Sequence, residues 1–584
     1  RELGPKIFSC PVSDRQASTM KSSHGNLKMD VINAARFYVD KIITDSSIQG
    51  MKALLMDARA TQAVSMVYSQ TQILEQEVYL VESIGKRHEA MHHLKAVMYL
   101  EPTEANMDLL VAEMKEPQFS EYHIFFANTV SPSMLSRLAQ ADEGENIRQV
   151  QEYYGDFLAV NEDLFHLGID NSLMLSAANS SRSLEASRIF ETNVKGVLAL
   201  LLALKRRPSQ IRYQGASDLA KRTASSVLDQ IENDDIFDFR RQDGPLLLIL
   251  DRRDDPVTPL LTQWTYQAMV HELLGLNNNR VVLRGAPGIN KDLEEVVISA
   301  TQDPFFAEQR FANFGDLGAA VKGLLDEYQK NAKMNENISS VEDMQAFMER
   351  YPAFRSHALN VSKHVALMGE LARLTDVYHL LDISQLEQEI ACSSDHSGHK
   401  RELMEKISSP AVQKADKLRL ALLYIIKYES YNELNEIKSA LNSNNVDKVF
   451  LLDAMIQYAG DHKRASGLFS QGGLMAKLGK TISSSVNGVE NVYTQHVPLL
   501  QNTLESIAKG KLKDSAFPLA SGGAGASGKP MEVIVYMVGG VTYEEAMCVA
   551  EFNKANQMTR VVLGGSCIQN STSFLEELKM SCER

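Results

Sequence analysis

The chain lacks several features that would assign it to a common functional class. It has five cysteines among 584 residues, and none of them form a CxxC pair. Such scattered cysteines argue against a disulfide scaffold or a structural zinc site, and they suit a reducing compartment. The formal net charge of −14 disfavours broad binding to nucleic acid. We therefore expect an intracellular protein that does not act on nucleic acid.

Long apolar runs are also missing. The longest strongly apolar stretch, GVLALLLAL at 196–204, has nine residues, whereas a membrane-spanning helix needs about 20. The first 28 residues contain no apolar core of the kind that a secretory signal requires, and we interpret 1–28 as a disordered leader. The pattern predicts a cytosolic protein that reaches membranes only through its partners.

The glycine motifs of nucleotide-binding and hydrolytic α/β proteins are absent as well. No GxGxxG follows a candidate strand, and no GxSxG occurs. The nearest approach to a phosphate loop is GGLMAKLGKT at 472–481, with five residues instead of four between the second and third glycines. This spacing matters because successive N–H groups must converge on the phosphates. These absences favour a binding scaffold over an enzyme.

What the sequence does contain is an alternation of helical and strand patterns. Helical spacing begins at 29–43, and continuous apolar segments bounded by polar residues follow it. Parallel strands that are buried on both faces have this composition, so the pattern predicts an open, largely parallel α/β sheet covered on both sides. The predicted strands are 52–58, 78–84, 94–102 and 121–130, and the predicted helices between them are 71–77 and 104–115.

The pattern changes after a further helix at 184–205 and a strand at 246–251. Helical periodicity dominates from 264 to 492, with a hairpin at about 315–381 that Pro352 interrupts. A Gly/Ser-rich loop at 513–530, which we expect to be flexible, precedes a return of strand–helix–strand pattern. The late return indicates that a helical domain is inserted into a second α/β sheet. The predicted domains are 29–157, the discontinuous 158–250 and 486–584, and the inserted 251–485.

Two motifs raise the question of a catalytic metal. LLLILDRRDDPVTP at 246–259 ends a buried strand with acids, and Asp251 at that position resembles the Mg²⁺ ligand of a nucleotide hydrolase. The usual preceding phosphate loop is missing, which favours a structural corner. In that interpretation Asp251 and Arg252 are held by pairing, while Pro256 and Pro259 stiffen the chain.

The second motif is HEAMH, which matches the HExxH of zinc proteases through His88 and His92. The connection between the flanking strands is too short for the long helix that such a site needs, and no third ligand follows. A solvated loop is the favoured interpretation. A metal-dependent hydrolase that uses Asp251, or His88 and His92, stays the alternative function, which metal analysis would distinguish.

The segment 246–280 strongly resembles the SM family, the Sec/Munc-type proteins that control SNARE assembly. The resemblance extends from Met29 to the C-terminus, and the matching segments are most similar to the endosomal and trans-Golgi branch of the family. It implies a three-domain arch with no catalytic residues and no cofactor. Further matching segments are VSMVYSQTQILEQEVYLVE at 64–82, HIFFANTV at 123–130, VQEYYGDFLAVNEDLF at 150–165 and YMVGGVTYEEA at 536–546.

Three sites follow from the resemblance, and the first is a pocket for a syntaxin N-terminal peptide. Leu135 is at the position of the apolar floor, Leu138, Ile147 and Val150 are its neighbours, and Glu152 is an acid on the rim. An apolar notch of this kind buries one anchor side chain, while the acid pairs with a basic residue. The alternative is that the four apolar residues simply pack two helices onto the sheet.

The second site is a central cleft that cradles the helical SNARE bundle. Glu82 matches an acid of that cleft, whereas Gln62 and Ser69 replace residues that are basic in neuronal relatives. The replacement leaves open whether a closed syntaxin is held in the same way.

The third site is the helical hairpin, a template for the other SNAREs. Pro352 matches a hinge, and His364 and Val365 match the region that touches the vesicle SNARE. An uncompensated proline inside a helix costs about 3 kcal/mol, so either a bent-to-straight switch or a permanent helix break is compatible with it. The resemblance thus predicts a monomer that binds a syntaxin-type Qa-SNARE and the assembling SNARE complex, and that is recruited peripherally to endosomal and trans-Golgi membranes.

Overall fold

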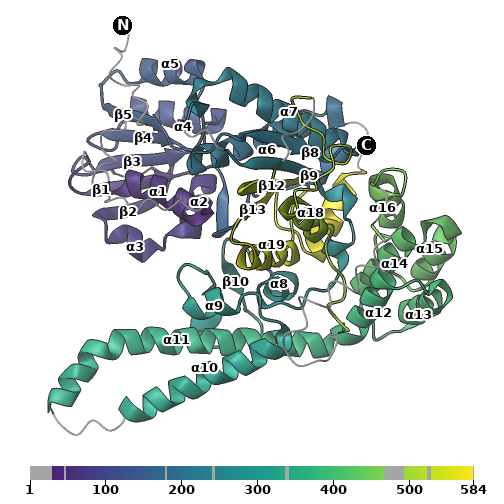
Figure 1. The fold of residues 1–584 in the computed structure, drawn as a ribbon. Helices are drawn as coiled ribbons and strands as arrows, with labels where there is room; N and C mark the ends of the chain where they lie inside the picture. The colour runs from purple at the N-terminus through teal and green to yellow at the C-terminus, as the bar shows by residue number, and fades with distance from the viewer. Residues whose placement is uncertain are drawn as a thin grey trace.

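The structure is a computed structural model, and it describes residues 29–44, 48–87, 89–177, 180–239, 244–335, 341–465, 468–469, 492–522 and 528–582. The predicted leader at 1–28 lies outside these ranges. Across the described part of the chain, no helix is both long enough and apolar enough to span a membrane. The described residues form two large sheets, a small two-stranded sheet and a helical region (Figure 1).

The first sheet has five strands in the order β2-β1-β3-β4-β5, and every neighbouring pair is parallel. Alternate residues of β1 pack into two different apolar clusters, Leu54 into one and Leu55 into the other, so both faces are covered as predicted. Its strands are β1 (Lys52–Met56), β2 (Val78–Ser83), β3 (Lys95–Leu100), β4 (Tyr122–Phe126) and β5 (Ile147–Glu152). Its helices are α1 (Val31–Ile43), α2 (Ala58–Val67), α3 (Gln70–Leu74), α4 (Glu104–Lys115) and α5 (Pro132–Ala141).

The second sheet takes its strands from two distant stretches of sequence. Its order is β6-β7-β13-β12-β9-β8, and only the β6–β7 pair is antiparallel. The strands are β6 (Leu158–Asn161), β7 (Leu164–His166), β8 (Gln210–Tyr213), β9 (Leu246–Asp251), β12 (Glu532–Val538) and β13 (Arg560–Gly565). Because β9 pairs with β12, the chain leaves the sheet, builds the helical region and returns to the same sheet. Helices α6 (Leu184–Leu204), α7 (Asp218–Asn233), α18 (Leu499–Ala508) and α19 (Tyr543–Ala555) accompany it.

The segment predicted as a flexible loop at 513–530 is attached to the second sheet over its first half. The N–H of Tyr213 donates to the carbonyl of Pro518 at 3.2 Å, and the N–H of Ala520 donates to the carbonyl of Ile211 at 2.9 Å. These bonds place the segment antiparallel along β8. Glycine and serine content does not show that an edge strand offers hydrogen-bond partners, so the contact of this segment with β8 could not be predicted from its composition. Residues 523–527 lie outside the described ranges.

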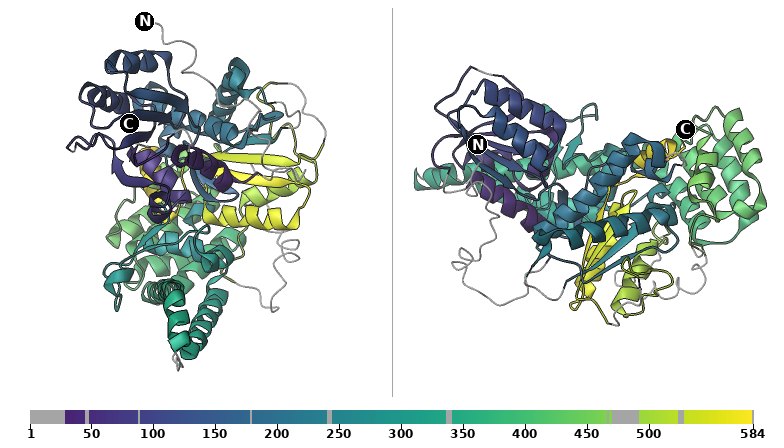
Figure 2. Two further views of the ribbon diagram at one scale, coloured as in Figure 1. Left: turned by 90° about the vertical axis from the view of Figure 1, so that its left-hand side faces the viewer. Right: turned by 90° about the horizontal axis from the view of Figure 1, so that it is seen from above.

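The helical region contains a long hairpin and a compact bundle. Helices α10 (Phe314–Asn335) and α11 (Val341–Val377) lie side by side and extend beneath the first sheet (Figures 1 and 2). The bundle consists of α12 (Leu380–Cys392), α13 (His396–Ser408), α14 (Lys414–Lys427), α15 (Leu434–Ser443) and α16 (Leu451–Ala459). The last helix, α20 (Ser571–Met580), contributes Phe574 to the apolar core of this bundle. The centroid of the Phe574 ring lies 6.4 Å from that of Tyr458.

Helical structure at the start of this region, where helical periodicity is predicted from 264, is short. A 3₁₀ turn at Thr258–Leu260 is followed by the helix α8 (Tyr266–Met269), which continues directly into a π-helix at Val270–Leu274. Residues 255–270 are buried throughout, so the apolar pattern reflects burial on all sides and not one helical face. An antiparallel pair, β10 (Arg280–Val282) and β11 (Glu295–Val297), and the helix α9 (Pro304–Gln309) follow.

Candidate functional site

The predicted peptide pocket lies where α5 meets the edge of the first sheet. Ser131 caps α5 through the N–H of Met134, and Pro132 occupies its first turn. Leu138 is only 2% exposed, whereas Leu135 is half-buried. Ile147 and Val150 belong to the edge strand β5 and are also half-buried beside α5. We call Leu135, Leu138, Ile147 and Val150 the α5–β5 surface.

These residues do pack together in one apolar cluster, as in the alternative interpretation, but one helix and one strand are involved and not two helices. The second half of the segment is a strand, because an edge strand with one open side tolerates the polar residues that obscure its pattern. Met134 and Val130 pack with the α5–β5 surface as well. Sequence reasoning missed both, although Met134 stands four residues before Leu138 and so shares its helical face.

Glu152 is held by neighbours within the chain. One carboxylate oxygen accepts the N–H of Val130 at 2.8 Å, and the other accepts the hydroxyl of Tyr154 at 2.9 Å. These bonds fix the loop that leads into α5. Its role in the structure is therefore to position the loop beside the α5–β5 surface, and each oxygen retains a lone pair for a donor from outside.

The three residues assigned to the central cleft are engaged in local contacts. Gln62 is half-buried on α2. Ser69 caps α3, where it forms a capping box with Gln72. Glu82 on β2 pairs with Lys86 at 2.7 Å. This capping role is enough to explain why a serine occupies position 69, whether or not Ser69 contacts a bound SNARE.

The hairpin residues fall into two environments. Pro352 lies within α11, which continues from Val341 to Val377, so the alternative of a permanent helix break is wrong. Val365 is 38% exposed, whereas His364 beside it is fully buried. Of the two residues predicted to mark the region that touches the vesicle SNARE, only Val365 has an accessible side chain in this conformation.

His364 instead anchors α11 to the body of the protein. Its Nε2 lies 2.9 Å from a carboxylate oxygen of Asp303, and its Nδ1 lies 2.8 Å from the hydroxyl of Tyr266. Asp303 also caps α9 through the N–H of Phe306 and pairs with Lys363. Burial alone would raise the pKa of Asp303, but its bonds with His364 and Lys363 hold that pKa well below the usual range.

The charges at the end of β9 all meet partners inside the molecule. Asp251 is 4% exposed, and its carboxylate accepts the hydroxyl of Ser217 at 2.6 Å and the N–H of Arg253 at 3.0 Å. Pro256 and Pro259 are buried in the turn that follows. Asp251 thus has an internal donor at each oxygen, which leaves it poorly suited to a metal ion.

Arg252 pairs with an acid that is remote in sequence and could not be predicted from the pattern around Arg252. Its guanidinium contacts the carboxylate of Glu545 on α19 and donates to the carbonyl of Asp255 at 3.2 Å. Both side chains of the ion pair are at most 1% exposed. Burial raises the pKa of Glu545 to about 7 against the opposing effect of Arg252. The predicted pairing of Arg252 is therefore present, with Glu545 as its partner.

The first sheet also carries acids at its carboxyl edge. Asp57 caps α2 through the N–H of Ala60 at 2.7 Å, and Asp156 pairs with Arg59 at 3.0 Å. Asn128 joins Asp156 to the carbonyl of Lys195 on α6. Burial, followed by the charge of Asp156, raises the pKa of Glu101 to about 7. This edge is a contact between the two α/β parts of the chain.

The remaining motifs supply no metal site in the described structure. His88 lies outside the described residues, and so does the segment 472–481. His92 is exposed in a turn before β3. Within the described ranges, no group of three or more His, Cys, Asp and Glu side chains is arranged to hold a metal ion.

Comparison with known proteins assigns the chain to a class. The model of the Sec1 family matches residues 52–577, so the chain belongs to the Sec1 family. This confirms the resemblance seen in the sequence.

Within that family the chain is similar to vacuolar protein sorting-associated protein 45. The Dictyostelium discoideum protein of that name is 44% identical over 555 residues, which cover 94% of this chain and 97% of the relative. The Homo sapiens protein is 44% identical over 561 residues, which cover 95% of this chain and 96% of the relative. A solved structure of the SM protein Vps45 in complex with the Qa SNARE Tlg2 superposes with a TM-score of 0.87 at 41% identity, covering 95% of this chain and 98% of that one. The chain therefore has the SM arch, with parallel α/β sheets and a helical region.

Proposed function

We propose that the protein binds a syntaxin-type Qa-SNARE and promotes assembly of the SNARE complex in endosomal, trans-Golgi and vacuolar transport. The observation that carries the proposal is the similarity to Vps45, whose structure was solved in complex with the Qa SNARE Tlg2. Members of the family regulate SNAREs without catalytic activity. In this proposal the protein is a monomer without a cofactor, present in the cytoplasm and recruited peripherally to membranes.

The α5–β5 surface serves as the tether for the N-terminal peptide of the Qa-SNARE. Leu135 presents an apolar side chain that stays half-buried when nothing covers it, and an anchor side chain of the peptide would complete its burial. Glu152 retains acceptor capacity beside it and attracts a basic residue of the peptide.

The central cleft and the helical hairpin act on the SNAREs together with the tether. In this proposal the central cleft of Gln62, Ser69 and Glu82 cradles the helical SNARE bundle, and the hairpin serves as a template for the other SNAREs. Val365 on α11 offers an exposed apolar contact to the vesicle SNARE. His364 holds the segment that carries Val365 in place.

The test is a pull-down of the protein by the N-terminal peptide of a candidate Qa-SNARE. We expect Leu135→Arg to reduce binding at least about tenfold, because a charge replaces the apolar contact. Leu74→Arg is the matched control, since Leu74 is 45% exposed on α3 and lies outside the α5–β5 surface. Unchanged binding of the isolated peptide to Leu135→Arg would remove the tether from the proposal.

The alternative of a metal-dependent hydrolase is not supported. Each carboxylate oxygen of Asp251 already accepts a hydrogen bond from within the chain, and the family acts without catalysis. Metal analysis of the purified protein checks this directly, and stoichiometric zinc together with hydrolysis lost in Asp251→Asn would restore the alternative.

A further inference from the structure

Each of the two large sheets ends in two edge strands, and three of these four edges are protected. The segment 516–520 pairs with β8. The strand β6 has only four residues, all of them buried. The strand β5 carries Arg148, which is 58% exposed, and charge on an edge strand opposes pairing with another chain. The fourth edge, β2, begins with four apolar residues, Val78–Val81, and its one charged residue, Glu82, is paired with Lys86.

The backbone of β2 has unpaired hydrogen-bonding groups along its outer side. The N–H of Ile84 donates to the carbonyl of Met56 in β1 at 2.9 Å, so the backbone of Ser83, which lies opposite Met56, points away from β1. Because the direction alternates along a strand, the backbone of Val81 points away from β1 as well. Within the described ranges, no hydrogen bond from elsewhere in the chain reaches the N–H of Ser83 or the N–H and carbonyl of Val81.

The side chains of β2 are apolar on both faces of the sheet. Leu80 packs against the apolar cluster on one face and Val81 against the cluster on the other, and both are only half-buried. Tyr79 is 64% exposed. Strands that are apolar on both faces are typical of the interior of a parallel sheet, yet β2 is the outermost strand on the side of α3 (Figure 1). A further strand beside β2 would complete the burial of these side chains.

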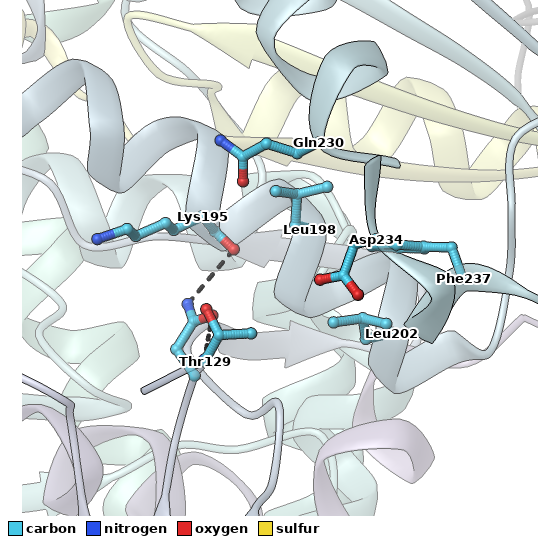
Figure 3. Close-up of a pocket in the computed structure, with 8 residues that line it drawn as sticks. Thr129, Lys195, Leu198, Leu202, Gln230, Asp234 and Phe237 are labelled. Atoms are coloured by element: carbon cyan, nitrogen blue, oxygen red, sulfur yellow. Dashed lines mark hydrogen bonds between the residues drawn. The ribbon is translucent and has the colours of Figure 1, made fainter. Parts of the chain in front are cut away.

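The part of the first sheet near β4 is instead closed by contacts within the chain. The carbonyl of Lys195 on α6 accepts the side-chain amide of Asn128 at 3.4 Å (Figure 3). The cavity beside this contact has a volume of about 60 Å³, which is too small for a segment of polypeptide. A partner chain therefore has no room there, in contrast to the free outer side of β2.

We infer that β2 binds an extended segment of a partner polypeptide, which joins the five-stranded first sheet as a sixth strand. The segment would pair with the N–H and carbonyl of Val81 and with the N–H of Ser83. In this mode the main-chain bonds give affinity and the side chains give specificity. The exposed carboxylates of Glu75 and Glu77 precede β2, so the segment has apolar residues on both faces and a basic residue beside these acids. The inference stands on the strand itself and does not require that the α5–β5 surface bind a SNARE.

The test uses the full chain and amide hydrogen exchange read at single residues. The probe is the peptide acetyl-Lys-Val-Leu-Val-Thr-Lys-amide, which is apolar on both faces when extended and has a base at each end. We expect rapid exchange at Val81 and Ser83 in the free protein, and saturating peptide should slow both at least about tenfold. The matched control peptide has the same side chains but a methyl group on every backbone nitrogen. It should leave the exchange unchanged, because it has no N–H to pair with β2.

Two variants at one position complete the experiment. Ser83→Pro removes the outward N–H but no bond to β1, and edge strands tolerate a proline in this orientation. It should weaken the peptide about tenfold, measured by the protection of Val81. Ser83→Ala keeps the N–H and should leave binding unchanged. If Ser83→Pro does not fold, the two peptides on the wild type decide the question.

Three results would each overturn the inference: no slowing at Val81 and Ser83, equal slowing by the methylated peptide, or equal effects of the two variants. Slowing that develops without peptide as the protein concentration rises would also overturn it, because the occupant of β2 would then be a second copy of this chain.

Discussion

The carboxyl edges of the two parallel sheets carry similar acids but are closed in different ways. At the second sheet, Arg252 and Glu545 are both at most 1% exposed and satisfy each other's charge. At the first sheet, Asp57 and Asp156 bind backbone N–H groups, amides and Arg59, whose side chain is 17% exposed. The second edge therefore depends on an ion pair shielded from water, while the first can exchange some of its contacts for water.

Both carboxyl edges are occupied by contacts within the chain, which leaves neither of them open to a small ligand. Open α/β sheets bind their ligands at the carboxyl edge of the strands. Here the first edge is joined to α6 through Asn128 and the carbonyl of Lys195, and the second is covered by the buried turn of 255–260. The chain has used both edges to join its own parts.

The substitution Arg252→Met gives the strongest test of the difference between the two sheet edges. The substitution leaves Glu545 buried without its countercharge, and we expect it to lower the free energy of unfolding by about 3–5 kcal/mol. Urea denaturation measures the loss. Lys448→Met is the control, since its ion pair with Glu576 is 44% and 54% exposed and should contribute at most about 1 kcal/mol. Equal losses in the two variants would show that the buried pair is no more important than an exposed one.

Asp251→Ala should have a smaller effect at the same edge. It leaves the hydroxyl of Ser217 and the N–H of Arg253 without their acceptor, for an expected loss of about 1–3 kcal/mol. Binding to a Qa-SNARE peptide should weaken only as far as the folded fraction falls. A variant that loses binding while its melting temperature is unchanged would contradict the structural role of Asp251.

Glu101→Gln tests the first edge through pH. The folded pKa of Glu101, about 7, lies above the ordinary 4.5, so its stabilising contribution is complete below pH 4.5 and is lost as the pH rises through 7. We expect the variant to be more stable than the wild type at pH 8, by about 1–2 kcal/mol after allowance for solvent screening, and equal to it near pH 4.

The control for this pH dependence is Glu104→Gln. The Glu104 side chain is 74% exposed, and the difference between this variant and the wild type should not change with pH by more than a few tenths of a kcal/mol. Thermal unfolding followed from pH 4 to pH 8 measures both variants. If the stability difference between Glu101→Gln and the wild type also stays constant from pH 4 to pH 8, water reaches this edge of the first sheet freely.

Sequence reasoning succeeded where structure depends on local pattern. Four strands of the first sheet, β1 to β4, follow from continuous apolar segments, and the helix at 104–115 follows from its helical spacing. The fifth strand, β5, was not predicted, because its polar residues obscure the apolar pattern. Partners remote in sequence were beyond it. Glu545 stands 293 residues after Arg252, and Asp303 stands 61 residues before His364. Periodicity carries no information on such pairs, so the burial of His364 and the true partner of Arg252 required the fold.

The segment along β8 has a consequence for the behaviour of the protein in a crowded cell. β8 is the last strand of its sheet, and an uncovered strand of this kind is a template on which other chains aggregate. The backbone of 516–520 takes up hydrogen-bonding groups of Ile211, Tyr213 and Gly215. The segment 516–520 thus covers the edge of the sheet against pairing with other chains, and its deletion should reduce solubility before it reduces affinity for any partner.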